Sequence, residues 1–321
     1  MAEGPEAAVA VVVVNWNGGD DTAACLRSLG TLDPPRPRPV VVDNGSTDGS
    51  AERIAAEFPD VDLVRSRRNL GFGGGANLGI RRALTLGADF VWLLNNDAIP
   101  GAGTLGALLA ETGDRRVGIV GGVLVDPADP EAVLAWGGGI VSPLAITTPL
   151  DGPGRMPDYV EGSCMLVRRG VFESVGLFDE GFFFYYEDAD LCRRAREAGW
   201  RLAVAPGARV AHAVGASINR DEEGRSRRAD ELQAESSGVF LGKHAGPLLV
   251  PAVALRLGGI VLRRAGRGEL GRVAVLARAL VSGARRGRHR RRLRRRPQEH
   301  GLARAPSEPT ARAHPGREPH S

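Results

Sequence analysis

Three carboxylates directly follow a run of aromatic side chains in the second half of the chain. Glu187, Asp188 and Asp190 come after the aromatic segment 182–186, and an arginine-rich helix is expected next. A desolvated carboxylate is costly unless it is paired or takes part in chemistry. An ionised carboxylate within reach of an alcohol can act as a general base, so these acids predict proton transfer from a hydroxyl-rich ligand. Helix capping and ion pairs with arginines three and four residues later explain Asp190 but not the aromatic run.

Polar residues that could bind a nucleotide follow two apolar segments. Asp43 and Asn44 end one of them, where they could contact a nucleobase or ribose, or only build a turn and cap a helix. Residues 69–79 form a glycine-rich loop before a helix, and such loops let backbone N–H groups approach phosphate. Residues 71–76 also fit the dinucleotide pattern G-x-G-x-x-A, but the fit is weak because they follow the third expected strand and not the first.

A possible cation site follows a further apolar segment. Asn95, Asn96 and Asp97 end this segment, and an aspartate at a strand end is well placed to hold a divalent cation that bridges phosphates. An Asx turn before Pro100 is the alternative. His212 ends a strand-like segment much later in the chain, so it belongs to this site only if the fold returns it to Asp97.

These motifs need a scaffold that gathers strand ends, and the first half of the chain supplies one. We expect strands at 9–15, 40–43, 61–65 and 90–94 and helices at 20–29, 50–58 and 74–86. This alternation predicts an α/β fold with a mostly parallel central sheet flanked by helices, which binds ligands beyond the carboxyl ends of its strands. Farther on we expect antiparallel additions within 118–169, helices at 171–175 and 190–198, and extended chain at 201–205 and 208–212.

Composition indicates the compartment. Of the 321 residues 43% are hydrophobic, which is enough for a full core. Cys25, Cys164 and Cys192 fit neither a disulfide framework nor a zinc site, and the chain does not start like a signal peptide. These features predict a reducing, cytoplasmic compartment.

Taken together and in order, the motifs resemble those of family 2 glycosyltransferases, which have the GT-A fold. Each motif is weak alone, but six in the right order over about residues 9–215 are specific. The matching segments are 12–18, 42–49, 69–73 with Asn77, 94–97, 186–191 and 208–212. The Asn-Trp-Asn-Gly and Asn-Leu-Gly-Phe signatures are closest in style to the bacterial rhamnosyltransferase-like branch.

The resemblance implies an inverting, metal-dependent hexosyltransferase. It would move a sugar, with rhamnose as a candidate, from a dTDP- or UDP-sugar to a hydroxyl of a glycan or polyprenyl-linked acceptor in cell-envelope polysaccharide synthesis. By motif, Asp188 matches the catalytic base and Glu187 would orient the acceptor. Asp97 and His212 match the ligands of Mg²⁺ or Mn²⁺. The residues expected to border the nucleotide sugar are Trp16, Asn17, Asp43, Asn44, Asn69, Gly71, Asn77, Asn95 and Asn96.

One position departs from the family pattern. Asn95 replaces the first acid of the D-x-D motif, which leaves one carboxylate and one imidazole and predicts weaker metal binding. Two other functions stay open. An inactive glycosyltransferase-like scaffold conflicts with the joint presence of Asp97, Asp188 and His212. A sugar-phosphate nucleotidyltransferase would need a glycine-rich loop with basic residues after the first strand, and residues 15–20 contain no basic residue.

The C-terminal third suggests an attachment to membranes. We expect a GT-A catalytic domain over 1–235 whose last part, 217–235, is a mobile loop leading into a helix. An amphipathic helical extension over 236–284 and a disordered Arg-rich tail over 285–321 should follow. The apolar segment 246–262 contains Arg256 and two prolines, which favours an interfacial over a spanning helix. From residue 263 to 296 there are 14 arginines and one acid. We therefore expect peripheral binding to the anionic inner face of the cell membrane; nucleic-acid binding is less favoured because no aromatics are interleaved.

Overall fold

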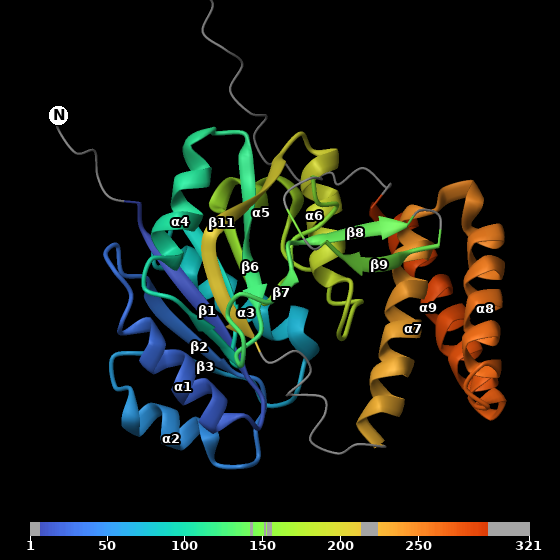
Figure 1. Ribbon diagram of the computed structural model, residues 1–321, viewed down its shortest axis with the longest axis horizontal. Coiled ribbons are helices and arrows are strands. Elements are labelled where there is room, and N and C mark those ends of the chain that lie inside the picture. Colours follow the sequence, from blue (N-terminus) through green and yellow to red (C-terminus); the bar gives the residue numbers. More distant parts are fainter. Residues whose placement is uncertain (1–6, 142–143, 151, 153–155, 213–223, 295–321) are drawn as a thin grey trace, which may run out of the picture.

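The structure is a computed structural model that describes residues 7–141, 144–150, 152, 156–212 and 224–294 (Figure 1). Strands and helices alternate through the first half, as predicted: β1 (Val9–Asn15), α1 (Gly19–Leu29), β2 (Arg38–Asp43), α2 (Ser50–Glu57), β3 (Asp62–Arg65), α3 (Gly71–Thr85) and β4 (Phe90–Asn95). The next part adds β5 (Ala98–Pro100), α4 (Thr104–Ala110), η1 (Glu111–Gly113), β6 (Val117–Val125), β7 (Val133–Ala135), β8 (Gly138–Val141), β9 (Ile146–Pro149), β10 (Cys164–Arg168), α5 (Arg169–Val175), α6 (Glu187–Glu197) and β11 (Arg201–His212). The last described elements are α7 (Gly224–His244), η2 (Gly246–Leu248), α8 (Leu249–Ala265), η3 (Leu270–Arg272) and α9 (Val273–Arg294).

A central sheet holds most of the strands, in the order β3-β2-β1-β4-β10-β6-β11-β5, with β7 beside β6. β3, β2, β1 and β4 are parallel, which confirms the prediction for the first half. β10 is antiparallel to both of its neighbours, β4 and β6, so the sheet as a whole is mixed. Asn15 is in register with Asp43, and Val14 with Asn95. The polar residues that follow these strands therefore meet at one edge of the sheet.

β1 is buried on both sides because helices cover both faces of the sheet. Successive side chains of a strand point to opposite faces, so Val12 packs in one core with Ile80 of α3, whereas Val13 packs in the other with Leu26 of α1. A strand that is buried in this way needs a continuous apolar run, which explains the valine-rich sequence of β1.

α7 and α9 pack against each other through glycines. A Cβ at Gly283 would lie 2.0 Å from the carbonyl oxygen of Glu235, and one at Gly238 would lie 2.1 Å from that of Leu280. The helices run parallel, since contacts advance along both: Gly238 meets Leu280, and Gly242 meets Ala284 four residues later. α8 connects α7 to α9 and carries the chain back in the opposite direction. It lies at the outer edge of the molecule, away from the sheet (Figure 1).

This packing corrects two expectations about the C-terminal third. α9 continues to Arg294, so the prediction of disorder from residue 285 is wrong for 285–294. Gly287 fits closely against α7, and Arg290 pairs with Asp179, which together keep this part of the helix ordered. The expected loop at 217–235 is helical from Gly224 onward. The predicted limits after residues 235 and 284 fall inside α7 and α9, while 217–223 and 295–321 lie outside the described residues.

Smaller differences concern the ends of elements. The segments 201–205 and 208–212 form one strand, β11, whose pairing with β6 shifts register between Val204 and Arg209. α6 starts at Glu187 and not at residue 190, so the carboxylates at 187 and 188 lie in its first turn.

Gly283→Ala is expected to lower the free energy of unfolding by about 1–3 kcal/mol, because the added methyl group must push α7 and α9 apart. Urea denaturation measures this change. Gly258 on α8 is the matched control, since nothing lies within 4 Å of a Cβ at that position. Gly258→Ala should leave stability unchanged or raise it by up to about 1 kcal/mol through helix propensity. Similar values for the two variants would contradict the close helix contact.

Candidate active site

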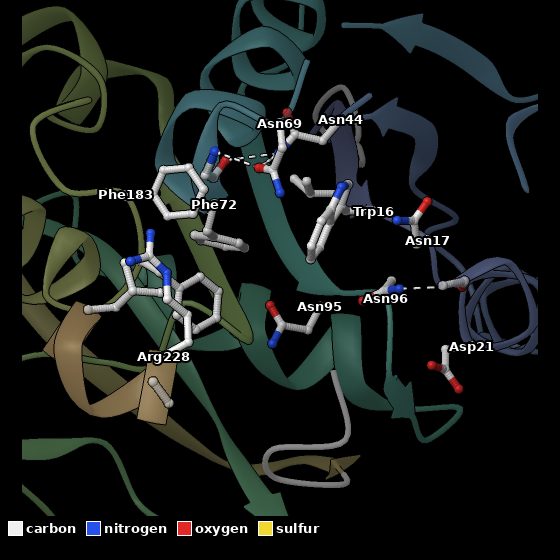
Figure 2. A pocket seen from close by; sticks show the side chains of 16 residues that line it. Trp16, Asn17, Asp21, Asn44, Asn69, Phe72, Asn95, Asn96, Phe183 and Arg228 are labelled. Atoms are coloured by element: carbon white, nitrogen blue, oxygen red, sulfur yellow. Dashed lines mark hydrogen bonds between the residues drawn. The ribbon is translucent and has the colours of Figure 1, made fainter. Parts of the chain in front are cut away.

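A pocket of about 560 Å³ opens where β1, β2 and β4 end (Figure 2). Its volume is typical of small-molecule sites. Seven of the nine residues predicted to border a nucleotide sugar line it: Trp16, Asn17, Asn44, Asn69, Gly71, Asn95 and Asn96. Asp43 and Asn77 are described but lie outside the pocket lining.

Buried polar side chains hold the strand ends in place. The side-chain nitrogen of Asn15 lies 3.2 Å from Asp43, 3.1 Å from Ser46 and 2.8 Å from Ser50. Asn15 is fully buried and Asp43 nearly so. Asp43 therefore supports the loop behind the pocket wall, which is the turn-building role that the sequence had left open beside a ligand contact.

Asn44 joins the end of β2 to the glycine-rich loop. Its side-chain oxygen accepts a bond from the backbone N–H of Leu70 (3.0 Å), and its amide donates to the carbonyl of Gly71 (3.0 Å) and to Asn69 (3.2 Å). These bonds satisfy backbone groups that a turn would otherwise leave unpaired. Two predicted nucleotide-binding motifs are thus parts of one hydrogen-bonded wall.

The loop also contacts the aromatic segment, and this contact requires glycine. Gly71 has φ +75°, and a Cβ there would lie 2.1 Å from the carbonyl oxygen of Phe183. The same oxygen accepts a bond from the backbone N–H of Phe72 (3.0 Å). The glycine-rich loop is therefore fixed by protein contacts on the side of Phe183.

Part of the aromatic run faces the pocket. Phe183 and Phe184 line it, whereas Phe182 and Tyr186 are buried in the core. Asn77 holds the chain that leads to this run, because its side chain accepts a bond from the backbone N–H of Phe178 (3.0 Å) and donates to the carbonyl of the same residue (3.0 Å). Asn77 thus positions the aromatic segment from outside the pocket.

Three carboxyl groups, those of Glu161, Glu187 and Asp188, gather behind Phe72. Phe72 lines the pocket, and Gly162 lies between its ring and Asp188: a Cβ at Gly162 would be 3.3 Å from the ring and 3.6 Å from the Asp188 Cβ. The predicted base therefore lies beside the pocket wall and not in the pocket itself.

Burial and mutual repulsion raise the pKa of these carboxyls. Burial, and then the charge of Asp188, raise the pKa of Glu161 to about 8 and that of Glu187 well above its usual range. Burial also raises the pKa of Asp188, but its oxygens accept bonds from the backbone N–H groups of Gly162 (3.1 Å) and Ala189 (2.7 Å), which favour the ionised form. Oε2 of Glu187 has no hydrogen-bond partner in the described part of the chain. The raised pKa values favour the protonated forms of Glu161 and Glu187, whereas the backbone bonds make Asp188 the group best suited to carry the charge.

The fold brings Asp97 and His212 together, as the metal interpretation required. β11 pairs with β5 so that His212 is in register with Ala98. Nε2 of His212 is 3.1 Å from Oδ1 of Asp97 and 3.2 Å from the side-chain nitrogen of Asn95. A carboxylate and an imidazole at this separation can both contact one cation. Within the described ranges no cluster of three or more His, Cys, Asp or Glu could hold a metal ion.

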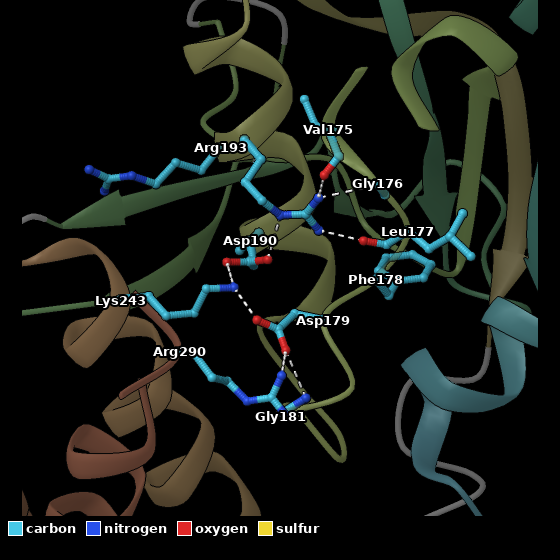
Figure 3. Close-up of polar contacts among 12 residues, drawn as sticks. Val175, Gly176, Leu177, Phe178, Asp179, Gly181, Asp190, Arg193, Lys243 and Arg290 are labelled. Carbon is cyan, nitrogen blue, oxygen red and sulfur yellow. Dashed lines mark hydrogen bonds and ion pairs between the residues drawn. The ribbon is translucent and has the colours of Figure 1, made fainter. Parts of the chain in front are cut away.

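A buried ion network joins α6 to the C-terminal helices (Figure 3). Lys243 of α7, the chain's single lysine, has its Nζ 2.5 Å from the carboxylates of both Asp179 and Asp190. Arg290 of α9 also pairs with Asp179. Because Asp190 follows Asp188 by two residues on α6, the network holds the helix that carries the predicted base.

The same helix has the ion pair expected at a spacing of four residues. Arg194 lies 2.8 Å from Asp190, and both side chains are buried. The pair expected at a spacing of three does not form, because Arg193 points outward and pairs with Glu197 (3.0 Å). His244 adds a further contact to Asp190 at 2.8 Å. These partners hold the pKa of Asp190 far below its usual range despite burial.

Lys243→Met is expected to lower the free energy of unfolding by about 3–5 kcal/mol, since it leaves two buried carboxylates short of positive charge. Arg193→Met is the matched control, because it breaks a half-exposed ion pair on α6 and should cost less than about 1 kcal/mol. Urea denaturation of both variants measures the difference. A Lys243→Met protein as stable as the control would show that the network contributes no net stability.

Two residues of the site, Arg228 and Glu161, were not predicted from the sequence. Arg228 of α7 lines the pocket together with Ala229 and Leu232, in a segment where a mobile loop was expected. The four-residue spacing of 228 and 232 is a helical signal that could have placed this face. Glu161 lies shortly before the apolar run 164–167, and an acid so close to an expected buried strand could have marked it.

Comparison with known proteins identifies the family. Residues 5–230 match the family described as "Glycosyltransferase like family 2". The chain is 32% identical over 284 residues to the N-acetylglucosaminyl-diphospho-decaprenol L-rhamnosyltransferase of Mycobacterium tuberculosis (strain ATCC 25618 / H37Rv), covering 79% of this chain and 90% of the relative. It is 26% identical to the galactofuranosyltransferase GlfT1 of Mycolicibacterium smegmatis, covering 75% of this chain and 82% of the relative.

Solved structures support the same fold. The mannosyltransferase PcManGT from Pyrobaculum calidifontis, in complex with GDP-Man and Mn²⁺, superposes with a TM-score of 0.53 at 19% identity over 86% of each chain. S. aureus TarS 1-349 gives a TM-score of 0.51 at 16% identity over 90% of this chain and 91% of that one. The predicted GT-A fold and family are thereby confirmed: the chain belongs to glycosyltransferase family 2 and is a glycosyltransferase.

Proposed function

We propose that this glycosyltransferase moves rhamnose from a nucleotide-diphosphate donor, such as dTDP-rhamnose, to a hydroxyl of a polyprenyl-linked or glycan acceptor in cell-envelope polysaccharide synthesis. The name of the Mycobacterium tuberculosis relative gives L-rhamnosyl transfer and a decaprenol-linked acceptor, and the alignment covers 90% of that relative. The observation that carries the proposal is the pocket at the strand ends with the carboxylate of Asp188 beside its wall.

In this proposal the nucleotide lies against the wall built from the ends of β1 and β2. The side chain of Trp16 is half exposed, so a face of its ring is free to stack on a base. Asn17, Asn44 and Asn69 offer amide groups to the base and ribose. Gly71 and the Asn95–Asn96 pair would border the diphosphate and the sugar. Asp43 and Asn77 act indirectly, through the loops that they hold.

Asp97 and His212 would hold Mg²⁺ or Mn²⁺. Their 3.1 Å contact supports a shared cation, and the amide of Asn95 lies beside them. A bound cation would neutralise charge that develops on the departing diphosphate. With two protein ligands the cation would be held partly by the donor itself, so metal and donor should bind together.

Asp188 would act as the base of a single displacement. The acceptor oxygen forms a bond to the anomeric carbon, the bond from that carbon to the diphosphate oxygen breaks, and the hydroxyl proton passes to Asp188. One displacement inverts the configuration. The raised pKa of Glu187 favours its protonated form, and its Oε2 has no partner among the described residues, so it could donate a hydrogen bond to the acceptor and orient it.

The test is calorimetry with dTDP-rhamnose, UDP-sugars and GDP-mannose, each with and without Mn²⁺. We expect one nucleotide sugar to bind, and to bind more tightly with Mn²⁺. Asp188→Asn should bind that donor as wild type does but lose transfer by about 10²–10⁴-fold, because it cannot take the proton.

Two results would contradict parts of this proposal. Wild-type turnover in Asp188→Asn would exclude Asp188 as the base. A wild-type protein that binds none of these donors would contradict nucleotide-sugar transfer altogether. Asp21→Asn is the control substitution, since Asp21 lines the far end of the pocket and has no proposed role in proton transfer.

We further propose that α8 attaches the enzyme to the inner face of the cell membrane. In the described part of the chain, residues Gly246–Ala265 alone have the length and apolar composition of a membrane-crossing helix, and only 6% of this stretch is buried. Leu248, Leu255 and Leu262 are exposed at seven-residue intervals and form one stripe. Packing of Ala252 and Ile260 on the rest of the protein favours a helix that lies in the interface over one that spans the bilayer.

Exposed arginines make an anionic lipid surface the fitting partner. Arg263 and Arg267 follow the stripe, and Arg278, Arg285 and Arg288 are exposed on α9. Each basic residue near such a surface contributes about 1 kcal/mol. Lipid attachment would bring the pocket near a polyprenyl-linked acceptor.

Leu255→Asp/Leu262→Asp is expected to reduce co-sedimentation with phosphatidylglycerol-containing vesicles by at least about tenfold, because both charges must enter the interface. Met156→Asp is the control, since Met156 is equally exposed but far from α8 in sequence. Point substitutions are preferable to truncation after Arg263, which would remove α9 and its packing on α7. Unchanged vesicle binding in the double variant would exclude α8 as the attachment site.

A further inference from the structure

Charge is scarce in the pocket. Among the described residues that line it, only Asp21 and Arg228 are acidic or basic. They lie at opposite ends of the pocket (Figure 2). The diphosphate group of a nucleotide sugar, or of a polyprenyl-linked acceptor, is strongly anionic and needs cationic or N–H partners once it leaves water. Arg228 is the pocket's one cationic side chain in the described part of the chain.

The position of Arg228 is set by the packing of α7. Arg228, Leu232 and Ser236 follow at intervals of four residues and therefore share one face of the helix. Leu232 lines the pocket, and the hydroxyl of Ser236 donates to the carbonyl of Phe184 at 2.7 Å. Lys243 fixes the same helix to Asp179 and Asp190 farther along. The start of α7 is thus held against the pocket by contacts that do not involve Arg228 itself.

The guanidinium of Arg228 is accessible to a ligand. Its side chain is 63% exposed, and its ion pair with Glu231 is 3.7 Å long, which exceeds a hydrogen bond. Figure 2 shows the side chain directed toward Phe72 and Phe183 and not away from the pocket. A purely solvated arginine would not need this direction, since water is available on the outer side of the helix.

We propose that Arg228 binds the diphosphate group of a ligand in this pocket. The inference rests on the proposed nucleotide-sugar chemistry and adds a residue of the C-terminal helices to it. The planar guanidinium can bond to two phosphate oxygens at once. The diphosphate can belong to the nucleotide donor or to a lipid-linked acceptor.

The experiment compares ligands that differ in the diphosphate alone. Wild type and Arg228→Gln, both as the full chain, are titrated calorimetrically with dTDP, UDP, thymidine and uridine. If the donor's diphosphate is bound, Arg228→Gln weakens the Kd of the nucleoside diphosphate by about tenfold or more and leaves nucleoside binding unchanged. Arg227→Gln is the matched control, since Arg227 is the exposed neighbour on α7 that does not line the pocket.

A kinetic experiment tests whether the bound diphosphate belongs to the lipid-linked acceptor. At saturating donor, the KM for a short-chain polyprenyl-diphosphate sugar rises about tenfold in Arg228→Gln if the arginine binds the acceptor. The inference is overturned if Arg228→Gln changes neither the Kd of the nucleoside diphosphates nor the KM for the acceptor. An equal loss of nucleoside and nucleoside-diphosphate binding also overturns it, because that would indicate a structural role. A wild-type protein that binds neither nucleoside diphosphate overturns the proposed function itself, so the two failures are distinguishable.

Discussion

The ammonium group of Lys243, enclosed between two buried carboxylates, is the interaction on which much of the remaining structure depends. Desolvating one ammonium and two carboxylates is costly, and close contact with additional hydrogen-bond partners offsets that cost. The chain otherwise uses arginine for every basic side chain apart from histidine. An ammonium is a compact charge that fits between two carboxylates, whereas a planar guanidinium needs more room. Through this contact, α6, the segment leading to Phe183, and α7 become one unit.

The catalytic half could be predicted from the sequence because its signals are local. Apolar runs and turn residues define β1 to β4, and parallel pairing then brings Asn44 and Asn95 to one edge. The meeting of Asp97 with His212 followed from the resemblance alone, since no local pattern links residues so far apart. Asp43 and Asn77 lie outside the pocket lining and hold neighbouring segments of the chain, because a carboxylate or an amide can bind a ligand or the protein backbone equally well. Tertiary contacts decide between these uses.

The C-terminal helices were harder to foresee for a different reason. Arginine-rich composition argued for a disordered tail from residue 285. This composition has the opposite meaning once α7 is present. Gly283 and Gly287 allow the backbones to approach, and Arg290 reaches the carboxylate of Asp179. Helix propensity is a weak guide where packing supplies most of the stability.

The parallel course of α7 and α9 has a topological consequence. Two parallel helices in succession require a third that carries the chain back, and α8 is that return. It cannot enter the contact between its neighbours, because the glycines leave no space there, so it forms an additional outer layer. An outer layer has one side that the described protein does not cover, and on α8 this side is hydrophobic. The low solubility expected of such a helix therefore follows from the connectivity of the chain and not from its overall composition, in which 43% hydrophobic residues are ordinary.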